Sequence, residues 1–240
     1  MTVLYSCYFG NASDQFPKLA RVLEATARAH CPDWEVRVER IADSKLRGPN
    51  GSPSRGDNSW KLQKWAEFSC ARPDGDRVLL LDTDTFVNAP LDPLWGHDFD
   101  LAYTVRGVDA PFPLNAGVIA LRVNDASRDF MRLWSRRDRE MFDDPALLAP
   151  WRRKYGGMNQ ASLGSLLEHG SGLTSWLTVA ALPCREWNAC DEADWCAFGP
   201  TTRIVHIKSA LRMAVFSQGA AVPLLRGLAR RWQVLYSAAD

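Results

Sequence analysis

Two aspartates at the end of a short aliphatic run are the residues of this sequence best suited to chemistry. Asp82 and Asp84 follow Leu79–Leu81 and are separated by one threonine. An unbroken apolar run predicts a strand buried on both faces, and parallel sheets bind ligands beyond the carboxyl ends of their strands. Side chains two residues apart point the same way on an extended chain, so both carboxylates can face one ligand. Their mutual repulsion favours a hard divalent cation between them.

The same spacing occurs twice more, at Asp74/Asp76 and at Asp98/Asp100, so the pattern alone is not specific. The first pair lies among turn residues, and the second opens the next predicted strand. Only the middle pair ends a strand. A solvated or helix-capping role is the alternative interpretation of that pair.

The composition is that of one globular domain without excess charge. The chain has 240 residues, enough for a large core, and a formal net charge of +1. This balance gives no electrostatic support for nucleic-acid binding. The sequence lacks a signal-peptide pattern and any run of about 18 apolar residues that would span a membrane. Its six cysteines lack the CxxC spacing of zinc sites, so we expect free thiols in a cytoplasmic protein.

The hydrophobic periodicity predicts alternating strands and helices. A strand at 2–9, a helix to about residue 30 and a strand at 35–41 form a βαβ unit. A helix is expected at 59–70 ahead of the aspartate strand, and two prolines exclude regular structure at 88–95. Further strands are predicted at 101–105, 116–123, 178–182 and 203–207, and further helices at 125–142 and 158–169. The sequence therefore predicts a single α/β domain with a Rossmann-like mixed central sheet flanked by helices.

Three polar or charged segments stand out, and two of them have two interpretations. Residues 45–58 are rich in Gly, Pro and Ser, which predicts either a lid over bound ligand or a plain surface loop. The run ArgArgAspArgGlu at 136–140 is expected to be a solvated helix face. Residues 223–236 predict a basic amphipathic helix opened by proline. Its apolar stripe suits either packing on the domain formed by residues 1–222 or contact with an anionic membrane surface.

Four motifs, in order, resemble the family 8 glycosyltransferases, which have the GT-A fold and include bacterial lipopolysaccharide galactosyltransferases and glycogenin. The motifs are DRVLLLDTDTFVNAPLDPLW, LNAGVIALR, MNQASL and RIVHI. They are similar to the family's metal-site segment, its Asn-Ala-Gly-Val strand, its helix with an Asp-Gln pair, and its C-terminal strand ending in histidine. The resemblance covers about three quarters of the chain.

The resemblance implies a metal site. It makes Asp82, Asp84 and His206 the ligands of Mn²⁺ or Mg²⁺, and imidazole beside carboxylates suits Mn²⁺ better than Ca²⁺. Taken alone, His206 would more often be a packed or hydrogen-bonded histidine. Its place at the end of an apolar strand, with the other motifs present, favours the ligand.

The resemblance also implies a nucleotide-sugar donor at this site. The residues that it places near the donor are Ser6, Tyr8, Lys61, Asp82, Thr83, Asn115, Ala116 and Gly117. Gly117 would remove a side chain where the backbone approaches the sugar, although a simple strand bulge is the alternative. After His206 the family has Gly and then Lys-Pro-Trp, and this chain departs from that pattern. Lys208 and Arg212 are the candidates to contact the diphosphate instead.

A second departure concerns the expected catalytic pair. The family's Asp-Gln is Asn159-Gln160 here, so an amide replaces a carboxylate that would hold sugar hydroxyls. The resemblance implies that the anomeric configuration is retained. Because Gln160 is a poor covalent nucleophile, a front-face reaction in which the leaving phosphate accepts the acceptor's proton fits better than a double displacement. An inverting enzyme would need a general base, for which Asp109, Asp191 and Asp194 are candidates.

These features predict a metal-dependent glycosyltransferase that uses a nucleotide-diphosphate sugar, expected to be UDP-linked, and a glycan or lipid-linked acceptor, as in bacterial surface-glycan synthesis. Residues 223–240 would provide any peripheral contact with the inner face of the membrane. A nucleotidyltransferase is a second hypothesis, disfavoured because no Gly-rich basic loop follows the first strand. A non-catalytic sugar-nucleotide binder is a third, suggested by Asn159 and by the altered segment after His206.

Overall fold

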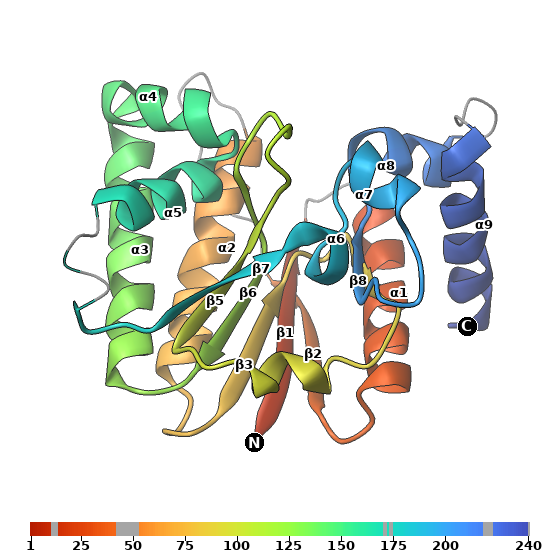
Figure 1. Cartoon of the computed structure of the whole chain (residues 1–240), viewed down its shortest axis with the longest axis horizontal. Coiled ribbons are helices and arrows are strands. Elements are labelled where there is room, and N and C mark those ends of the chain that lie inside the picture. The colour runs from red at the N-terminus through yellow and green to blue at the C-terminus, as the bar shows by residue number, and fades with distance from the viewer. Residues whose placement is uncertain (11–13, 42–52, 170–171, 173–174, 218–222, 240) are drawn as a thin grey trace.

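The core of the structure is a six-stranded mixed sheet, seen in the centre of Figure 1. The computed structural model describes residues 1–10, 14–41, 53–169, 172, 175–217 and 223–239. The strands are β1 (Thr2–Phe9), β2 (Glu35–Ile41), β3 (Arg77–Leu81), β5 (Leu101–Val105), β6 (Leu114–Arg122) and β7 (Val179–Pro183). Their order is β2-β1-β3-β6-β5-β7; β6 is antiparallel to both its neighbours, and the other pairs are parallel. The predicted mixed Rossmann-like sheet is confirmed.

Alternating side chains on the strands build a core on each face of the sheet. Tyr5 packs on the side covered by α2 (Pro53–Cys70) and α3 (Asp125–Asp143). Leu4, its neighbour in β1, packs on the other side with residues of α1 (Gln15–His30). Figure 1 shows these helices on opposite sides of the sheet. The result is a three-layer α/β arrangement whose strand ends are open to a ligand at one edge.

After β3 ends, the chain enters a second, smaller sheet. Its two antiparallel strands are β4 (Thr85–Val87) and β8 (Ile204–His206). The aspartate segment therefore consists of two strands in different sheets, joined by the turn that contains Asp82 and Asp84, and not of one continuous strand.

Five short helices lie where the sequence prediction excluded regular structure, at 88–95, or assigned no element. They are the 3-10 helix η2 (Asp92–Gly96), α4 (Pro145–Tyr155), α6 (Cys184–Trp187), α7 (Glu192–Cys196) and α8 (Ser209–Phe216). The prediction of irregular structure at 88–95 is confirmed for 88–91 and wrong for 92–95, because proline occupies the first turn of η2, as it does in α4. The missing N–H of proline has no helical partner at that position, so the helix tolerates it.

Two other predictions need correction. Of the predicted loop, residues 45–52 lie outside the described residues, and 53–58 form the start of α2, which begins at Pro53 and not at Ser59. In α3, Asp138 is only 1% exposed although the charged run around it was expected to face solvent. It accepts hydrogen bonds from the hydroxyls of Ser59 (2.5 Å) and Ser162 (2.8 Å), which lie in α2 and in α5 (Met158–His169).

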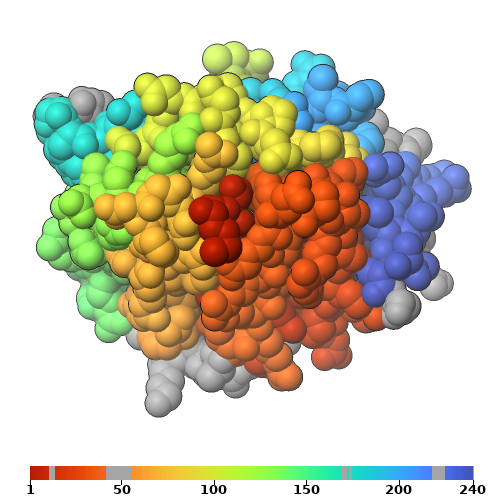
Figure 2. Space-filling model, turned by 90° about the horizontal axis from the view of Figure 1, so that it is seen from below, coloured from red at the N-terminus to blue at the C-terminus, as the bar shows by residue number. Residues whose placement is uncertain are grey.

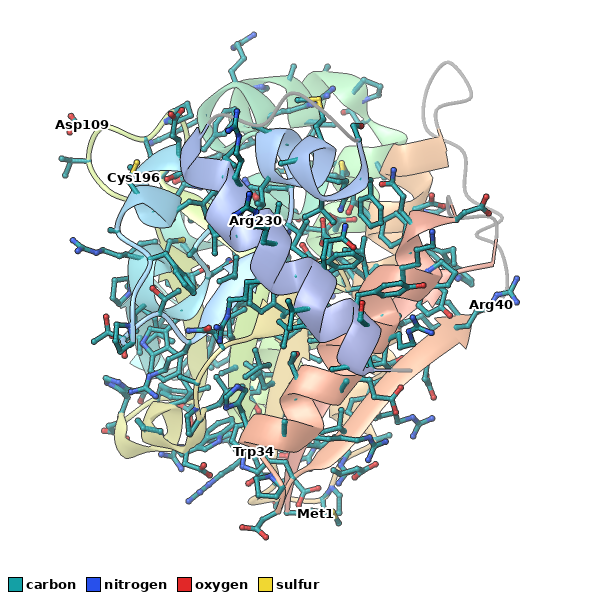
Figure 3. The ribbon with its side chains drawn as sticks, turned by 90° about the vertical axis from the view of Figure 1, so that its right-hand side faces the viewer. Met1, Trp34, Arg40, Asp109, Cys196 and Arg230 are labelled. Atoms are coloured by element: carbon teal, nitrogen blue, oxygen red, sulfur yellow. The ribbon has the colours of Figure 1, made fainter. Side chains whose placement is uncertain are left out.

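The C-terminal helix α9 (Pro223–Ala238) lies against the outside of the domain, in front of α1 in Figure 3 and beside it at the edge of Figure 2. Leu225, Leu228 and Trp232 are buried in a cluster with residues of α1 and α8, whereas Arg230 is exposed. The apolar stripe is thus covered by the protein itself. Among the described helices, none has the length and apolar character needed to cross a membrane.

Candidate active site

Backbone pairing brings the two aspartates and His206 together. The Asp82 N–H donates to the carbonyl of Gly117 at 2.8 Å, which continues the pairing of β3 with β6 by one residue. Beyond the turn, Thr85 is opposite His206 in the second sheet, and the Ile207 N–H donates to the Asp84 carbonyl at 2.6 Å. The change of sheet therefore places both carboxylates beside the imidazole.

Thr83 points away from this cluster and anchors the turn to β1. Its hydroxyl donates to the carbonyl of Cys7 at 2.9 Å, and its oxygen lies 2.8 Å from the hydroxyl of Ser6. Both side chains are buried, Ser6 completely. The structure thus does not bring Ser6 and Thr83 to the cavity described below, and it gives them a role in holding the turn. Tyr8 is half-buried farther along β1 and also lies outside that cavity.

The spacing of the three side chains fits a divalent cation. Nε2 of His206 lies 3.1 Å from Oδ1 of Asp84 and 3.7 Å from Oδ2 of Asp82. Adjacent ligands of an octahedral ion with bonds of about 2.0–2.1 Å are about 3 Å apart. Two carboxylate oxygens and one imidazole nitrogen are a donor set that suits Mn²⁺ and also accepts Mg²⁺. The residues present therefore fit the predicted metal.

Two side-chain cations also lie in the cluster. Lys61, on α2, forms an ion pair with Asp82, and Arg212, on α8, forms one with Asp84. These two cations already compensate the repulsion between the carboxylates, so repulsion by itself is no evidence for a metal. The inference of a metal site rests on the type and spacing of the three ligand atoms. Burial raises the pKa of Asp84, but the charges of His206, Arg212 and Lys61 outweigh burial and hold this pKa below its ordinary value.

Gly117 is needed by the cluster itself. A Cβ atom at this position would lie 2.6 Å from Cε1 of His206 and 2.9 Å from Oδ2 of Asp82. Real Cβ atoms do not approach other atoms this closely, so any other residue would displace the two side chains. The structure thus supplies a reason for this glycine that the sequence did not, because it makes room for side chains of the site.

A cavity of about 170 Å³ opens beside the cluster. The predicted site residues that line it are Lys61, Asp82, Asn115, Ala116, Gly117, Asn159, Gln160, His206 and Lys208. Asn58, from the helical turn predicted as a loop, also lines it. Asp84 and Arg212 are not among the described residues that line the cavity, and they join the cluster through the contacts given above.

Asn159 and Gln160 reach the cavity from the first turn of α5. Gly156, which ends α4 two residues before this helix begins, has φ +86°, a backbone conformation that favours glycine, and it permits the sharp entry expected from the sequence. Nδ2 of Asn159 donates to the carbonyl of Asn58 at 3.1 Å, and Nε2 of Gln160 donates to the carbonyl of Tyr155 at 2.6 Å. Oδ1 of Asn159 is buried and has no hydrogen-bond partner in the described structure.

The three candidate general bases lie elsewhere. Asp109 is exposed at the tip of the β5–β6 connection, far out in Figure 3. Asp191 caps α7 by accepting from the Asp194 N–H at 3.1 Å, and Asp194 accepts from the Cys190 N–H at 3.1 Å. None of the three is among the described residues that line the cavity.

Sequence reasoning missed Asn188, which is completely buried beside the cluster. Its Oδ1 lies 3.1 Å from Nδ1 of His206, and its Nδ2 lies 2.8 Å from Oγ1 of Thr104 and 3.0 Å from Oδ1 of Asn115. No motif marks this position, because a single asparagine after a tryptophan has no periodic or spacing signal.

Comparison with known proteins supports the same fold. No protein-family model and no curated protein sequence matches the chain. The crystal structure of the galactosyltransferase LgtC with donor and acceptor sugar analogs matches with a TM-score of 0.57 and 17% identity, over 99% of this chain and 96% of that one. A glycosyltransferase involved in glycosylation of the major capsid of PBCV-1 matches with a TM-score of 0.58 and 14% identity, over 87% and 94%.

The glycosyltransferase GlyE of Streptococcus pneumoniae TIGR4 matches with a TM-score of 0.60 and 14% identity, over 99% of this chain and 63% of that one. Identities this low establish the fold. The chain therefore has the GT-A fold of these glycosyltransferases, as the four motifs predicted.

Proposed function

We propose that this protein is a metal-dependent glycosyltransferase that transfers a sugar from a nucleotide-diphosphate donor, UDP-linked, to a glycan or lipid-linked acceptor. The observation that carries the proposal is the Asp82, Asp84 and His206 cluster, which lies beside a cavity in a GT-A fold. Known glycosyltransferases share this fold, and one of them was crystallised with donor and acceptor sugar analogs.

The charged residues would act on the diphosphate. When bound, Mn²⁺ or Mg²⁺ would stabilise the negative charge that develops on the leaving diphosphate. Lys61 and Lys208 line the same cavity and bring two further positive charges close to that group. Lys61 is held over the ring of Trp65, with Nζ 4.5 Å from its centroid. This contact orients the ammonium group before the donor binds.

The amide residues would hold the sugar. Oδ1 of Asn159 is a buried acceptor without a partner, and a sugar hydroxyl is a donor that would satisfy it. Gln160 has its Nε2 engaged with the Tyr155 carbonyl, which limits its side chain to one orientation. The cavity of about 170 Å³ is small compared with the roughly 300–1,000 Å³ typical of sites for drug-sized ligands. It would take the sugar and part of the diphosphate.

A retaining reaction is the outcome that this arrangement favours. The residues predicted as general bases for inversion lie away from the described cavity, and Gln160 is a poor covalent nucleophile. In the front-face reaction, the acceptor hydroxyl attacks the anomeric carbon on the side from which the diphosphate leaves. The bond from that carbon to the leaving oxygen breaks, and that phosphate oxygen receives the hydroxyl proton.

A thermal-shift panel of nucleotide sugars with and without Mn²⁺ tests the proposal, because a ligand that binds the folded state raises Tm. We expect UDP-sugars to raise Tm only with the metal, and Asp84→Asn to abolish this rise. Asp98→Asn is the matched control, because Asp98 belongs to another Asp-x-Asp pair and is exposed. Equal metal-dependent shifts in the two variants would refute the metal site.

Turnover separates the enzyme from the non-catalytic alternative. A donor that stabilises the wild-type protein with Mn²⁺ should also be consumed with Mn²⁺ when acceptor glycans are supplied, and the product should retain the anomeric configuration. Stabilisation by the donor without turnover in any acceptor panel would favour the sugar-nucleotide binder.

A further inference from the structure

We infer that Asn188 is a positioning residue that keeps a proton on Nδ1 of His206 and directs Nε2 of the ring toward the metal. This inference rests on the proposed metal site but goes beyond it, because it assigns the hydrogen-bonding state of the ring and the residue that sets it. Asn188 directly follows α6 and has no exposed surface.

Backbone contacts hold Asn188 beside the histidine. The Asn188 N–H donates to the Cys184 carbonyl at 2.8 Å, which ends the single turn of α6. The next residue, Ala189, forms a bridge with β8: its N–H donates to the Ile204 carbonyl and its carbonyl accepts from the His206 N–H, both at 2.9 Å. The position of Asn188 next to the imidazole is therefore set by the main chain.

The orientation of the Asn188 side-chain amide follows from the backbone N–H of Gly117, which can only donate and which is linked to Asn188 through Asn115. The backbone N–H of Gly117 lies 2.8 Å from the Asn115 side chain, so the Asn115 atom that it meets must be the oxygen. The Asn188 atom 3.0 Å from that oxygen must then be the nitrogen. Thr104 agrees, because its hydroxyl donates to the Asn115 carbonyl at 2.7 Å and leaves its oxygen to accept from Nδ2 of Asn188.

Because Nδ2 of Asn188 donates to Thr104 and Asn115, the side-chain oxygen of Asn188 faces His206. Nδ1 of the ring lies 3.1 Å from that oxygen and can form a hydrogen bond only if it carries a proton. Nε2 faces Asp82 and Asp84, and when protonated it can donate to Oδ1 of Asp84 at 3.1 Å. A metal ion would take the place of a proton on Nε2, whereas Asn188 keeps the proton on Nδ1. When the neutral imidazole has its proton on Nδ1, the lone pair is on Nε2, as a metal ligand requires. A backbone N–H in β6 thus determines, through two asparagines, that Nδ1 of His206 meets an acceptor and keeps its proton.

Two substitutions of Asn188 separate its acceptor from its donors. Asn188→Leu and Asn188→Asp both remove the Nδ2 donor used by Thr104 and Asn115, so both disturb that part of the network. Only Asn188→Asp retains an oxygen that can accept from Nδ1 of His206. A merely structural role predicts that the same nitrogen of His206 carries the proton in both variants, whereas the positioning role predicts that the two variants differ in this respect.

The first measurement is Mn²⁺ affinity, obtained from the electron paramagnetic resonance signal of free Mn²⁺. We expect Asn188→Leu to bind Mn²⁺ about 10- to 100-fold more weakly than Asn188→Asp, because removing a hydrogen-bond partner of a metal-ligating histidine typically has an effect of this size. Equal affinity in wild type, Asn188→Leu and Asn188→Asp would overturn the inference.

The second measurement is the ¹⁵N spectrum of protein labelled at histidine, without metal and at mildly alkaline pH. The chain contains four histidines, and His206→Gln identifies the relevant signals. We expect Nδ1 of His206 to be protonated in the wild type and in Asn188→Asp, and Nε2 to carry the proton in Asn188→Leu. An unprotonated Nδ1 in the wild type would overturn the inference. If the wild type bound no Mn²⁺, the metal proposal would fail, and this spectrum would still decide where the proton lies.

Discussion

Gly117 and His206 come from different sheets, yet a single Cβ added to Gly117 would lie 2.6 Å from Cε1 of the imidazole. The glycine is in β6 of the main sheet, and the histidine ends β8 of the small one. The absence of a side chain at 117 allows the two sheets to bring their polar groups into one cluster. The Asn-Ala-Gly motif is thus connected to the predicted metal ligands through packing as well as through the cavity.

Gly117→Ala should therefore weaken the metal site. The added methyl group forces His206 and Asp82 apart, and overpacking of this kind lowers the free energy of unfolding by about 1–3 kcal/mol. We expect Mn²⁺ and a UDP-sugar to give no increase in Tm in this variant. Gly107→Ala is the control, because a Cβ at that loop position meets no atom within 4 Å. A wild-type response to Mn²⁺ in Gly117→Ala would show that the cluster adjusts without losing its ligand geometry.

Local patterns were enough to predict several elements. The bounds of β1, β2, β5 and α5 agree with the sequence prediction: β1 is an apolar run that ends before Gly10, β2 alternates polar and apolar residues, and α5 follows Gly156 and Gly157. The helix η2 was missed because proline was taken to exclude regular structure, although proline is accepted in a first turn.

Side chains whose role depends on tertiary contacts could not be predicted. Asn188 gains its role from the β-bridge between Ala189, which follows α6, and Val205 in β8. Nothing near Asn188 in the sequence indicates this bridge. The resemblance placed Ser6 and Thr83 near the nucleotide-sugar donor, but in the structure their hydroxyl groups form a hydrogen bond with each other. A motif fixes the residue type, whereas the direction of the side chain depends on the neighbours with which it packs.

Gln160→Ala should separate catalysis from binding. If Gln160 acts on the charge or orientation of the transition state, kcat should fall by roughly 10²-fold, as for removal of a polar group that acts there. The Kd for the donor, measured by calorimetry with Mn²⁺, should change far less. An equal loss in kcat and in donor affinity would make Gln160 an ordinary binding residue, and the retaining mechanism would then need another stabilising group.

Asp138 should make stability depend on pH. Burial raises the pKa of this carboxyl group, although hydrogen bonds from Ser59 and Ser162 oppose the change. The folded state thus holds this proton more strongly than the unfolded state. The contribution of Asp138 to stability is fully present below the unfolded pKa of about 3.9 and is lost as pH rises through the higher folded pKa.

Asp138→Asn removes the titrating group, so the stability of wild type relative to this variant should fall as pH rises above about 4. Urea unfolding of both proteins across this range measures the difference. Asp129→Asn serves as a control on the same helix, because its carboxylate is exposed and its removal should change stability by at most about 0.5 kcal/mol. Parallel stability curves for wild type and Asp138→Asn would contradict the raised pKa.

The tail helix α9 should contribute to the stability of the domain. Trp232 is 2% exposed, and Gln233 donates from Nε2 to the carbonyl of Val215 at 2.8 Å, so the helix is fixed to α8. Trp232→Ala should lower the free energy of unfolding by about 3–5 kcal/mol, the range for truncating a buried aromatic side chain. Val234→Ala is the matched control on the same helix, since Val234 is 68% exposed and should change stability by at most about 0.5 kcal/mol.

The same packing argues against membrane binding through the apolar stripe of α9. A stripe that covers Leu19 and Leu211 is not free to enter a bilayer unless the helix leaves the domain, which would expose this core. Only the exposed basic face, which includes Arg230, would then meet an anionic surface. Each arginine would contribute about 1 kcal/mol of binding free energy, which salt strongly screens. We therefore expect the intact protein to stay in solution when anionic vesicles are sedimented, at low and at high salt. A peripheral electrostatic contact would instead be established if the protein pelleted at low salt, and if both Arg230→Glu and high salt reduced this pelleting. Pelleting that persists at high salt would require α9 to leave the domain.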